Sequence, residues 1–399
     1  MKYPIGLQSF DQLIEDGYVY VDKTDMVYSL ATEGKIYFLS RPRRFGKSLL
    51  VSTLKNYFLG RKELFKGLKI ESLEKDWKVY PVFHLDFNGG DFTQKGVLEQ
   101  WISDFISLWE DKYELKSNPN YPIGLRFLRL LEHVHNIHGC RAVVLVDEYD
   151  KPILDVLDVD KNLEEEHRNI LKGFYSVFKS ADEHLQFVFL TGVTKFSQVS
   201  VFSGFNQPFD ISMHGKYETL CGISQAELEA TFREPIDKMR EFYRCSYDEM
   251  MTMLKSQYDG YHFSDNMTDV YNPFSLLNAF STKRISDYWF KSGTPTYLIR
   301  LLSHTNENMN EITGKYYSAE EFIDYKATVE QPLPMIYQSG YLTIKDFNLR
   351  RNAFLLDYPN NEVKKGFLSL IAGSCFKTNE SIYSWIQNAA IQLEDGKVE

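Results

Sequence analysis

The tripeptide Gly46-Lys47-Ser48 has the clearest chemistry in the sequence, because it stands between a short apolar run and an amphipathic stretch. A glycine in such a turn lets the backbone approach a phosphate, and the following helix N-terminus supplies free N–H groups and partial positive charge. Lys47 would bridge the β- and γ-phosphates of a nucleotide, and the Ser48 hydroxyl would be a ligand of Mg²⁺. The residues predicted to bind the nucleotide are Arg41, Pro42, Arg43, Arg44, Phe45, Gly46, Lys47, Ser48 and Leu49.

The loop departs at one position from the pattern GxxxxGK[ST], because Arg41 stands where the first glycine is expected. That glycine normally relieves a tight turn, so we expect a different loop entrance here. The alternative for the whole segment is a basic surface turn. Arg41, Arg43 and Arg44 place three guanidinium groups around the loop, where they could clamp phosphates or meet a neighbouring subunit or a nucleic acid. Solvent exposure is the alternative for each arginine.

An acidic pair, Asp147-Glu148, follows the apolar run Val143 to Val146. At the carboxyl end of a strand, Asp147 can hold the Mg²⁺ shell, and Glu148 can polarise a water for in-line attack on the γ-phosphate. Such pairs also often cap a following helix. The order of the motifs favours catalysis, because the glycine-lysine strand comes first, one strand intervenes and the acidic strand follows. Ser48 and Asp147 are therefore the predicted Mg²⁺ ligands.

A third polar position ends the apolar run Phe187 to Leu190. Thr191, Thr194 and Lys195 are candidates for the residue that senses the γ-phosphate or orients the attacking water. The alternative is that these side chains only satisfy a turn. The residues predicted to be catalytic are Lys47, Glu148 and Thr191.

These positions require a sheet whose strands end at one edge. Apolar runs too short for helices predict buried strands at Ile36 to Ser40, Val79 to Phe87, Ala142 to Val146, Phe187 to Leu190 and, more weakly, Phe209 to Ser212. Amphipathic stretches predict crossover helices at Ser48 to Leu59, Lys95 to Trp109, Ile123 to Ile137 and Glu164 to Ala181. The alternation predicts an α/β fold with a parallel sheet covered on both faces. The order of the motifs along it is similar to that of P-loop NTPases of the AAA+/STAND-like kind, with an additional strand between the two motifs.

From about Lys216 the pattern becomes mostly helical. Helices are predicted at Ser224 to Tyr243, Tyr247 to Gln257 and Pro273 to Phe280. A helix around Met335 to Gln338 precedes two apolar segments, Gly340 to Ile344 and Ala353 to Leu356, which flank the polar turn Asn348 to Asn352 and predict a β-hairpin. A helix followed by a hairpin indicates a winged-helix-like module.

The last amphipathic segment, Ser381 to Leu393, predicts a helix with an apolar stripe that includes Trp385. We expect that stripe to pack on the lid or to dimerise; an ordinary core helix is the alternative. The predicted domains are a P-loop ATPase core over residues 1–215, a helical lid over 216–310, a winged-helix-like module over 311–365, and a C-terminal helix over 366–399 that leads to an absent domain.

Composition limits the class of protein. The 399 residues include 45 Lys and Arg against 55 Asp and Glu, a formal net charge of −10, which still leaves room for a local basic site. With 43% hydrophobic and 25% charged residues the chain is close to the globular average, which excludes disorder, collagen and a coiled coil. No apolar run approaches the roughly 18 residues of a membrane span. Four scattered cysteines fit a reducing compartment, so we expect a cytoplasmic protein with no membrane partner.

Several motifs together resemble one known family, the AAA-ATPase-like proteins of bacteria, which typically carry a PD-(D/E)XK nuclease-like domain at the C-terminus. The matching stretches are Tyr18 to Thr24, Arg41 to Ser48, Asp147 to Pro152, Thr191 to Ser197, Tyr258 to Tyr261, Tyr271 to Phe274 and Ser292 to Thr296. The family's loop also carries arginine in place of the first glycine, so the resemblance implies nucleotide binding despite Arg41. We expect its nuclease-like part to be missing from this sequence, which is then either truncated or a short member of the family, because the ExK triplets, such as Glu362-Val363-Lys364, have no partnering acidic strand. We therefore expect no nuclease activity.

The motifs and the resemblance predict an ATPase that hydrolyses ATP with Mg²⁺ to drive a domain movement, controlling a C-terminal effector. The alternative is a nucleotide-dependent switch or a nucleic-acid-binding module with little turnover. Adenine is favoured over guanine because the segment Thr194 to Ser197 lacks the acidic residue of an (N/T)KxD motif.

Adenine contacts are expected from Tyr18 to Thr24, although this segment could equally only cap a helix through Asp22. The expected partners are ATP and ADP, with a nucleic acid or protein meeting the lid or the winged-helix-like module. For a nucleic acid the candidates are Lys345, Arg350 and Arg351, and an oligomer is possible.

Overall fold

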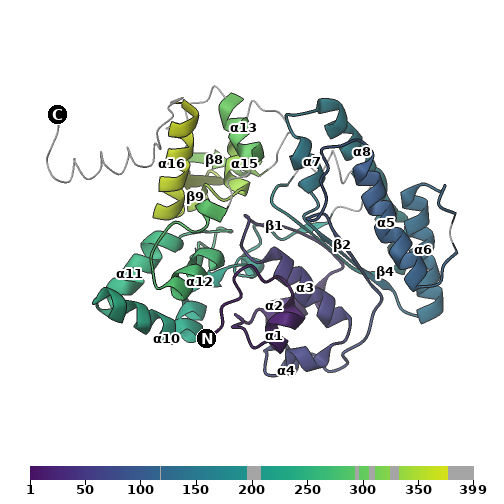
Figure 1. Cartoon of the computed structure of the whole chain (residues 1–399), viewed down its shortest axis with the longest axis horizontal. Helices are drawn as coiled ribbons and strands as arrows, with labels where there is room; N and C mark the ends of the chain where they lie inside the picture. The colour runs from purple at the N-terminus through teal and green to yellow at the C-terminus, as the bar shows by residue number, and fades with distance from the viewer. Residues whose placement is uncertain (117, 196–207, 293–295, 305–310, 324–331, 376–399) are drawn as a thin grey trace.

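The computed structural model describes residues 1–116, 118–195, 208–292, 296–304, 311–323 and 332–375 (Figure 1). At its centre is a five-stranded parallel sheet in the order β2-β3-β4-β1-β5. The strands are β1 (Ile36–Ser40), β2 (Val82–Asp86), β3 (Ala142–Asp147), β4 (Leu185–Gly192) and β5 (Phe209–Asp210). All five predicted strands are present. β3 is buried at every position, which explains why it is a continuous apolar run.

The strand order brings the two sequence motifs to one edge of the sheet. β2 separates them along the chain, whereas β4 separates them in space, with Ser40 of β1 paired with Gly192 and Val146 of β3 paired with Leu190. Because parallel strands end at the same edge, the segments after β1, β3 and β4 lie side by side. This confirms the predicted α/β class with the additional strand.

Helices cover both faces of the sheet. Figure 1 shows α1 to α4 on one side of the strands and α5, α6 and α8 on the other. Their bounds are α1 (Phe10–Glu15), α2 (Thr24–Glu33), α3 (Lys47–Phe58), α4 (Ile70–Leu73), α5 (Val97–Lys112), α6 (Ile123–His138), α7 (Lys151–Val156) and α8 (Lys161–Ser180), with short 3₁₀ turns at Lys62–Phe65 and Asp182–His184. The four predicted crossover helices are α3, α5, α6 and α8. No bounds were predicted for α1, α2, α4 and α7, although a helix after Asp22 was one alternative considered for Tyr18 to Thr24. Three of these helices span only four to six residues, too few for a visible period.

The next part of the chain is helical and has its own hydrophobic core. It contains η3 (Gly215–Tyr217), β6 (Ile223–Ser224), α10 (Gln225–Tyr243), α11 (Tyr247–Tyr258), β7 (Val270–Tyr271) and α12 (Pro273–Thr282). Capping boxes fix the starts of α10 and α11 through Ser224 with Glu227 and Ser246 with Glu249. The three predicted helices are therefore present.

The remaining described residues form a small α/β unit that shares the hydrophobic core of the main sheet. Its elements are η4 (Phe290–Ser292), α13 (Thr296–His304), β8 (Lys315–Ser318), α14 (Ala319–Phe322), α15 (Leu333–Gln338), β9 (Thr343–Asn348), β10 (Ala353–Asp357) and α16 (Asn361–Cys375). The predicted hairpin is β9 and β10, and β8 pairs with the far side of β10. The exposed and polar edge strand β8 was missed.

Helix α16 runs through position 365, where the sequence analysis placed a domain boundary. The predicted helix Ser381 to Leu393, including Trp385, lies outside the described residues. Within the part of the chain that the structure describes, none of the helices has both the length and the apolar character needed to cross a bilayer.

Candidate nucleotide site

The loop between β1 and α3 passes twice through the left-handed region, with φ 67° at Arg44 and φ 95° at Gly46. Gly46 is the N-cap of α3, so the first N–H groups of that helix have no helical acceptor. Alternating backbone conformations of this kind gather N–H groups into a concave anion site. No atom lies within 4 Å of the position a Cβ would take at Gly46, so its dihedral angle, not crowding, favours the glycine.

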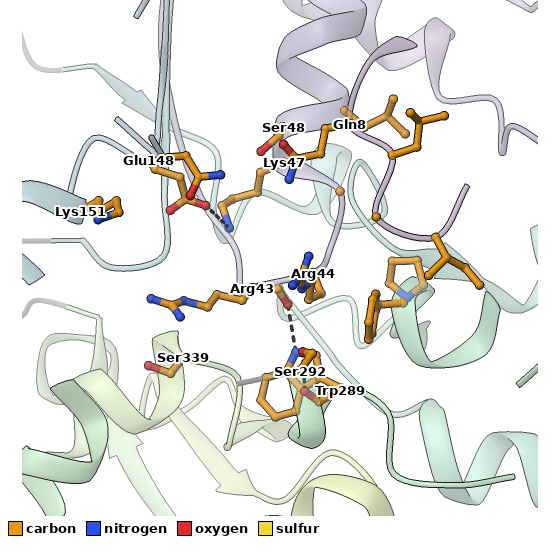
Figure 2. Close-up of a pocket in the computed structure, with 18 of the residues that line it drawn as sticks. Gln8, Arg43, Arg44, Lys47, Ser48, Glu148, Lys151, Trp289, Ser292 and Ser339 are labelled. Atoms are coloured by element: carbon orange, nitrogen blue, oxygen red, sulfur yellow. Dashed lines mark hydrogen bonds and ion pairs between the residues drawn. The ribbon is translucent and has the colours of Figure 1, made fainter. Parts of the chain in front are cut away.

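The Lys47 side chain is buried and folds back over the loop. Its Nζ donates to the carbonyl oxygens of Arg41 (3.1 Å) and Pro42 (3.3 Å) and lies 3.6 Å from Oε1 of Glu148. Figure 2 shows Lys47 and Glu148 converging from opposite sides. A phosphate in the loop would offer charged oxygens to Nζ, which make a stronger hydrogen bond than neutral carbonyls.

Asp147 and Thr191 are buried next to each other at the carboxyl ends of β3 and β4. Oδ1 of Asp147 accepts hydrogen bonds from Oγ1 of Thr191 (2.5 Å) and from the backbone N–H of Glu148 (3.1 Å). Glu148 itself has φ 53°, a left-handed conformation that few non-glycine residues adopt. The turn separates the two acidic side chains: Asp147 is buried at the strand end, and Glu148 faces the space above the loop.

Asp150 fixes the chain that follows β4. It is fully buried, and its Oδ2 accepts hydrogen bonds from the N–H groups of Val193 (3.0 Å) and Thr194 (2.6 Å) and from Oγ1 of Thr194 (2.7 Å). Burial, together with the nearby Glu148 carboxylate, raises the pKa of Asp150 to about 6. Lys195 pairs with Asp210 of β5 at 2.9 Å. Thr194 and Lys195 therefore satisfy a turn, the alternative considered for them from the sequence.

A cavity of about 390 Å³ opens above the loop, between the sheet edge and the later parts of the chain (Figure 2). Six segments far apart in sequence line it: residues 4–8, the loop and the start of α3, Asn88 after β2, the turn after β3 with α7, the start of α12, and residues of the C-terminal unit. The lining side chains of the last two segments are Pro273, Phe274, Leu277, Trp289, Ser292, Tyr297, Ser339 and Tyr341.

The structure brings most of the predicted site residues together at this cavity. Those that line it are Arg43, Arg44, Gly46, Lys47, Ser48, Leu49 and Glu148. Asp147 and Thr191 lie one layer below, joined by their hydrogen bond. The side chains of Arg41, Pro42 and Phe45 lie elsewhere.

Arg41 is the clearest correction to the sequence analysis. Its Nη1 donates to the carbonyls of Ser212 (2.6 Å) and Ser40 (2.9 Å), and its Nη2 donates to the carbonyl of Tyr217 (3.2 Å). The guanidinium carbon lies 4.1 Å from the centre of the Phe263 ring. With only 2% of Arg41 exposed, both expectations for its side chain, a phosphate clamp and a solvent-exposed group, are wrong. It anchors the loop entrance to the chain after β5 instead.

Phe45 turns toward the helical part and packs edge-on against Tyr261 and Phe263. It also borders a second, mostly apolar cavity of about 100 Å³ that shares Gly46, Leu49, Pro273 and Leu277 with the first. The segment Tyr18 to Thr24 contributes Val19, Tyr20, Val21 and Lys23 to this second cavity.

Asp22, in the same segment, accepts hydrogen bonds from the N–H and Oγ1 of Thr24, where α2 begins. The segment Tyr18 to Thr24 thus borders an apolar cavity and also starts a helix, so both of its predicted uses fit the structure.

Ser48 and Asp147 present oxygen ligands of the kind that Mg²⁺ prefers. Among the described residues, the Ser48 hydroxyl has no hydrogen-bond partner, and both protein donors to the Asp147 side chain use Oδ1. Oδ2 of Asp147 is therefore left for other contacts, and the residues present fit the ion.

Sequence reasoning missed the parts of the cavity wall that come from distant segments. Residues 4–8 carried no chemical signal, and Trp289, Tyr297 and Ser339 occur in unremarkable local sequence. Lys151 could have been predicted to lie at the site, because it follows the acidic pair by three positions. Its Nζ donates to the Gly90 carbonyl (2.9 Å) and to Asp155 (2.5 Å).

The three basic side chains of the hairpin that were candidates for nucleic-acid binding differ in their exposure to solvent. Lys345 is turned inward, where its Nζ donates to the carbonyls of Gly260 (2.8 Å) and Pro359 (3.0 Å), so it is not available to a nucleic acid. Arg350 and Arg351 are exposed at the turn between β9 and β10, as that hypothesis requires.

Comparison with known proteins identifies relatives of the sequence. A family model described as predicted AAA-ATPase matches residues 4–202. A protein of Azotobacter chroococcum mcd 1, described as an uncharacterized protein in the vnfD 5' region, is 38% identical over 372 residues. The alignment covers 91% of this chain and 68% of the relative.

Two solved structures are similar at a lower level. The Orc1 protein of Aeropyrum pernix, determined in complex with DNA, has 10% identity and a TM-score of 0.30, covering 89% of this chain and 95% of that one. Cdc6p from Pyrobaculum aerophilum has 12% identity and a TM-score of 0.32, with the same coverage.

Proposed function

The chain belongs to the family of predicted AAA-ATPases, and from this premise we propose that it binds ATP with Mg²⁺ in the 390 Å³ cavity and hydrolyses it. The observation that carries the proposal is the approach of Lys47 and Glu148 to 3.6 Å across the mouth of the loop. A cation placed for the phosphates and a carboxylate placed for a water then face the same small space.

Each side chain has a separate role in this proposal. The backbone N–H groups at the start of α3 and Lys47 bind the β- and γ-phosphates. Ser48 and Asp147 would hold Mg²⁺, which neutralises phosphate charge when it is bound. Glu148 orients a water and accepts its proton, and Thr191 fixes the orientation of the Asp147 carboxylate through the 2.5 Å hydrogen bond.

The apolar second cavity supports adenine as the base. It lies next to the loop, shares Gly46 and Leu49 with the main cavity, and is bordered by Val19 to Val21 and by Leu277 of α12. An aromatic base can be buried there against apolar side chains while the phosphates reach the loop. ATP would thus contact both the sheet and the helical part, which supports a lid role for α10 to α12.

A nucleotide-controlled switch with little turnover is the second candidate. Trp289 Nε1 donates to the carbonyl of Arg43 at 3.0 Å, so the C-terminal unit touches the loop directly. Occupancy of the loop could therefore control an effector through this unit without rapid hydrolysis. If the unit acts as a winged helix, the exposed Arg350 and Arg351 are its contacts for a nucleic acid.

Calorimetric titration with ATP and Mg²⁺, combined with a phosphate-release assay, tests the proposal. Lys47→Ala is expected to weaken ATP binding by about 1.5–3 kcal/mol, because hydrogen bonds to charged groups are lost. Glu148→Gln should bind ATP as the wild type does and release no phosphate. An unchanged affinity in Lys47→Ala would overturn the site, and wild-type turnover in Glu148→Gln would remove Glu148 from its role. Tight binding with negligible wild-type turnover would favour the switch.

A further inference from the structure

In the described cavity wall, the guanidinium groups belong to two arginines of the loop, Arg43 and Arg44. The lining contains four cationic side chains, Arg43, Arg44, Lys47 and Lys151. Lys151 is held by Asp155 and by the Gly90 carbonyl. The cavity residues contributed by α12 and the C-terminal unit include neither arginine nor lysine. A guanidinium for the transferred phosphoryl group must therefore come from the loop or from outside the described chain.

The two loop arginines point in different directions. Figure 2 shows the Arg43 side chain extended to the side of the cavity where Glu148 and Ser339 lie. The Arg44 guanidinium lies 5.1 Å from the ring centre of Phe274, at the start of α12. Arg43 is thus the loop arginine on the side of Glu148, the residue expected to act as the general base.

The C-terminal unit fixes Arg43 from two directions. Its carbonyl accepts the Trp289 Nε1–H hydrogen bond at 3.0 Å, and its guanidinium carbon lies 5.7 Å from the ring centre of Tyr297. Within the described part of the chain, the guanidinium forms no ion pair. An exposed guanidinium held by its backbone and by one ring, and free of carboxylates, can take a phosphate oxygen without breaking an existing pair.

Tyr297 links this arginine to the acidic side of the cavity. The ring is buried and its hydroxyl lies 3.1 Å from Oγ of Ser339. Burial raises the pKa of Tyr297 to about 12, the positive charge of Arg43 opposes that rise, and the negative charges of Asp150 and Glu148 add to it. Tyr297 therefore contacts both the Arg43 guanidinium and Ser339, and all three residues line the cavity.

We propose that Arg43 is a catalytic residue that acts in cis, its guanidinium contacting the γ-phosphate, and that Tyr297 is its positioning residue. This inference rests on the proposed ATPase function. In the step, the water oxygen bonds to the γ-phosphorus as the bond to the β,γ-bridging oxygen breaks. The electron pair of that bond leaves on ADP, and a water proton passes to Glu148. Arg43 stabilises the charge on the γ-phosphate oxygens during this exchange, without a second copy of the chain.

The first experiment compares ATP affinity by calorimetry with phosphate release in Arg43→Ala, Arg43→Lys and the wild type. Because such an arginine acts mainly in the transition state, Arg43→Ala should keep its ATP affinity within about fivefold and lose about 10³-fold or more in turnover. Arg43→Lys should remain well below wild type, because an ammonium lacks the guanidinium fork. Arg141→Ala, at the opposite end of β3, is the matched control and should behave as wild type. Wild-type turnover in a folded Arg43→Ala protein would overturn the inference.

The second experiment separates action in cis from action in trans. Arg43→Ala and Glu148→Gln are mixed in equal amounts at several total concentrations. If Arg43 acts in cis, both kinds of site stay defective and the mixture remains inactive. If the arginine of one copy served the site of another, Glu148→Gln subunits would supply it to Arg43→Ala sites, and recovered activity would overturn the inference.

Tyr297 variants test the positioning role. Tyr297→Ala should lower kcat with little change in KM, whereas Tyr297→Phe keeps the ring beneath the guanidinium and should restore most of kcat. Equal losses in both variants, or a loss confined to KM, would contradict positioning through the ring. If the wild type neither binds nor hydrolyses ATP, the proposed function fails as well; if only the arginine and tyrosine variants behave as wild type, the function stands and this inference falls.

Discussion

Asp147 and Glu148 are neighbours in sequence but serve different parts of the site, because the backbone turns sharply between them. Asp147 still pairs with Asp86 in the sheet, whereas Glu148 has φ 53°. The first side chain therefore stays with Thr191 at the strand end, and the second rises to Lys47. A left-handed conformation costs a non-glycine residue about 1–2 kcal/mol, so stability is given up here for the direction of one carboxylate.

Two separate variants, Glu148→Gly and Glu148→Ala, measure the cost of this left-handed conformation. We expect Glu148→Gly to be more stable than Glu148→Ala by about 1 kcal/mol, because only glycine adopts positive φ without strain. Urea unfolding of the two variants gives the difference. At the exposed position Glu165 in the helix α8, the same pair of substitutions should give the opposite sign. A more stable alanine variant at position 148 would show that the turn carries no strain.

The predicted site residues that lie at the cavity are those whose positions depend on local backbone. Glu148 directly follows β3, and Lys47 and Ser48 begin α3 at the end of the loop that follows β1, so the sheet edge fixes their place. The prediction for the Arg41 side chain was wrong because its carbonyl partners, Ser212 and Tyr217, lie about 170 residues further along the chain. The sequence around Arg41 shows no periodicity or composition that would indicate such a distant contact.

At the scale of elements, the start of α16 reaches the loop through one intermediate residue. Glu362, in the first turn of that helix, is buried and accepts the backbone N–H of Trp289 at 2.6 Å. Trp289 in turn donates to the carbonyl of Arg43. Burial, with a smaller contribution from Asp287, raises the pKa of Glu362 to about 7. The carboxyl thus binds a proton in the folded protein at pH values where the unfolded chain has lost it.

Stability should therefore depend on pH through Glu362. Its folded pKa of about 7 exceeds the ordinary value of 4.5, so its contribution is present below about pH 4.5 and is lost as pH rises to about 7. Glu362→Gln keeps an uncharged acceptor for Trp289, and we expect it to melt several degrees above wild type at pH 8.5 and close to it at pH 5. The exposed substitution Glu241→Gln should show no such divergence. Parallel melting curves for Glu362→Gln and wild type would contradict a buried titrating carboxyl.

The elements predicted from sequence were those with a strong period or a continuous apolar run. β3, α6 and α10 fall within three residues of their predicted bounds. The strand β8 was missed because it is an edge strand whose residues are mostly exposed, so burial imposes no alternation on it. The largest mismatch among the strands is at β9, predicted at Gly340 to Ile344 and observed at Thr343–Asn348. It arises because the ends of a strand are decided by pairing with its neighbours.

At the scale of the whole molecule, one cavity collects residues from position 4 to position 341. The C-terminal unit shares the hydrophobic core of the main sheet, whereas the helices α10 to α12 form a separate core. The loop therefore lies between a unit continuous with the sheet and a helical part that packs by itself. A nucleotide that touches both must change how firmly they are held together, and any ligand that binds the folded state stabilises it.

Trp289 reports on this arrangement, because it lines the cavity and holds the loop. We expect ATP with Mg²⁺ to change the tryptophan fluorescence of the wild type, and Trp289→Phe to abolish most of that change. The same variant loses the Nε1–H donor to Arg43 but keeps an aromatic ring, so ATP affinity measured by calorimetry should fall by only about 0.5–1.5 kcal/mol.

Trp77→Phe provides the matched comparison, since Trp77 packs against Tyr57 and Phe65 away from the cavity. Its ATP-dependent fluorescence change and its affinity should both remain as in the wild type. A full fluorescence response in Trp289→Phe would mean that ATP binds without reaching the C-terminal unit, and the loop would then act apart from it. A response confined to Trp289 would instead show that nucleotide in the loop affects a residue far along the chain, because the loop and the C-terminal unit line the same cavity.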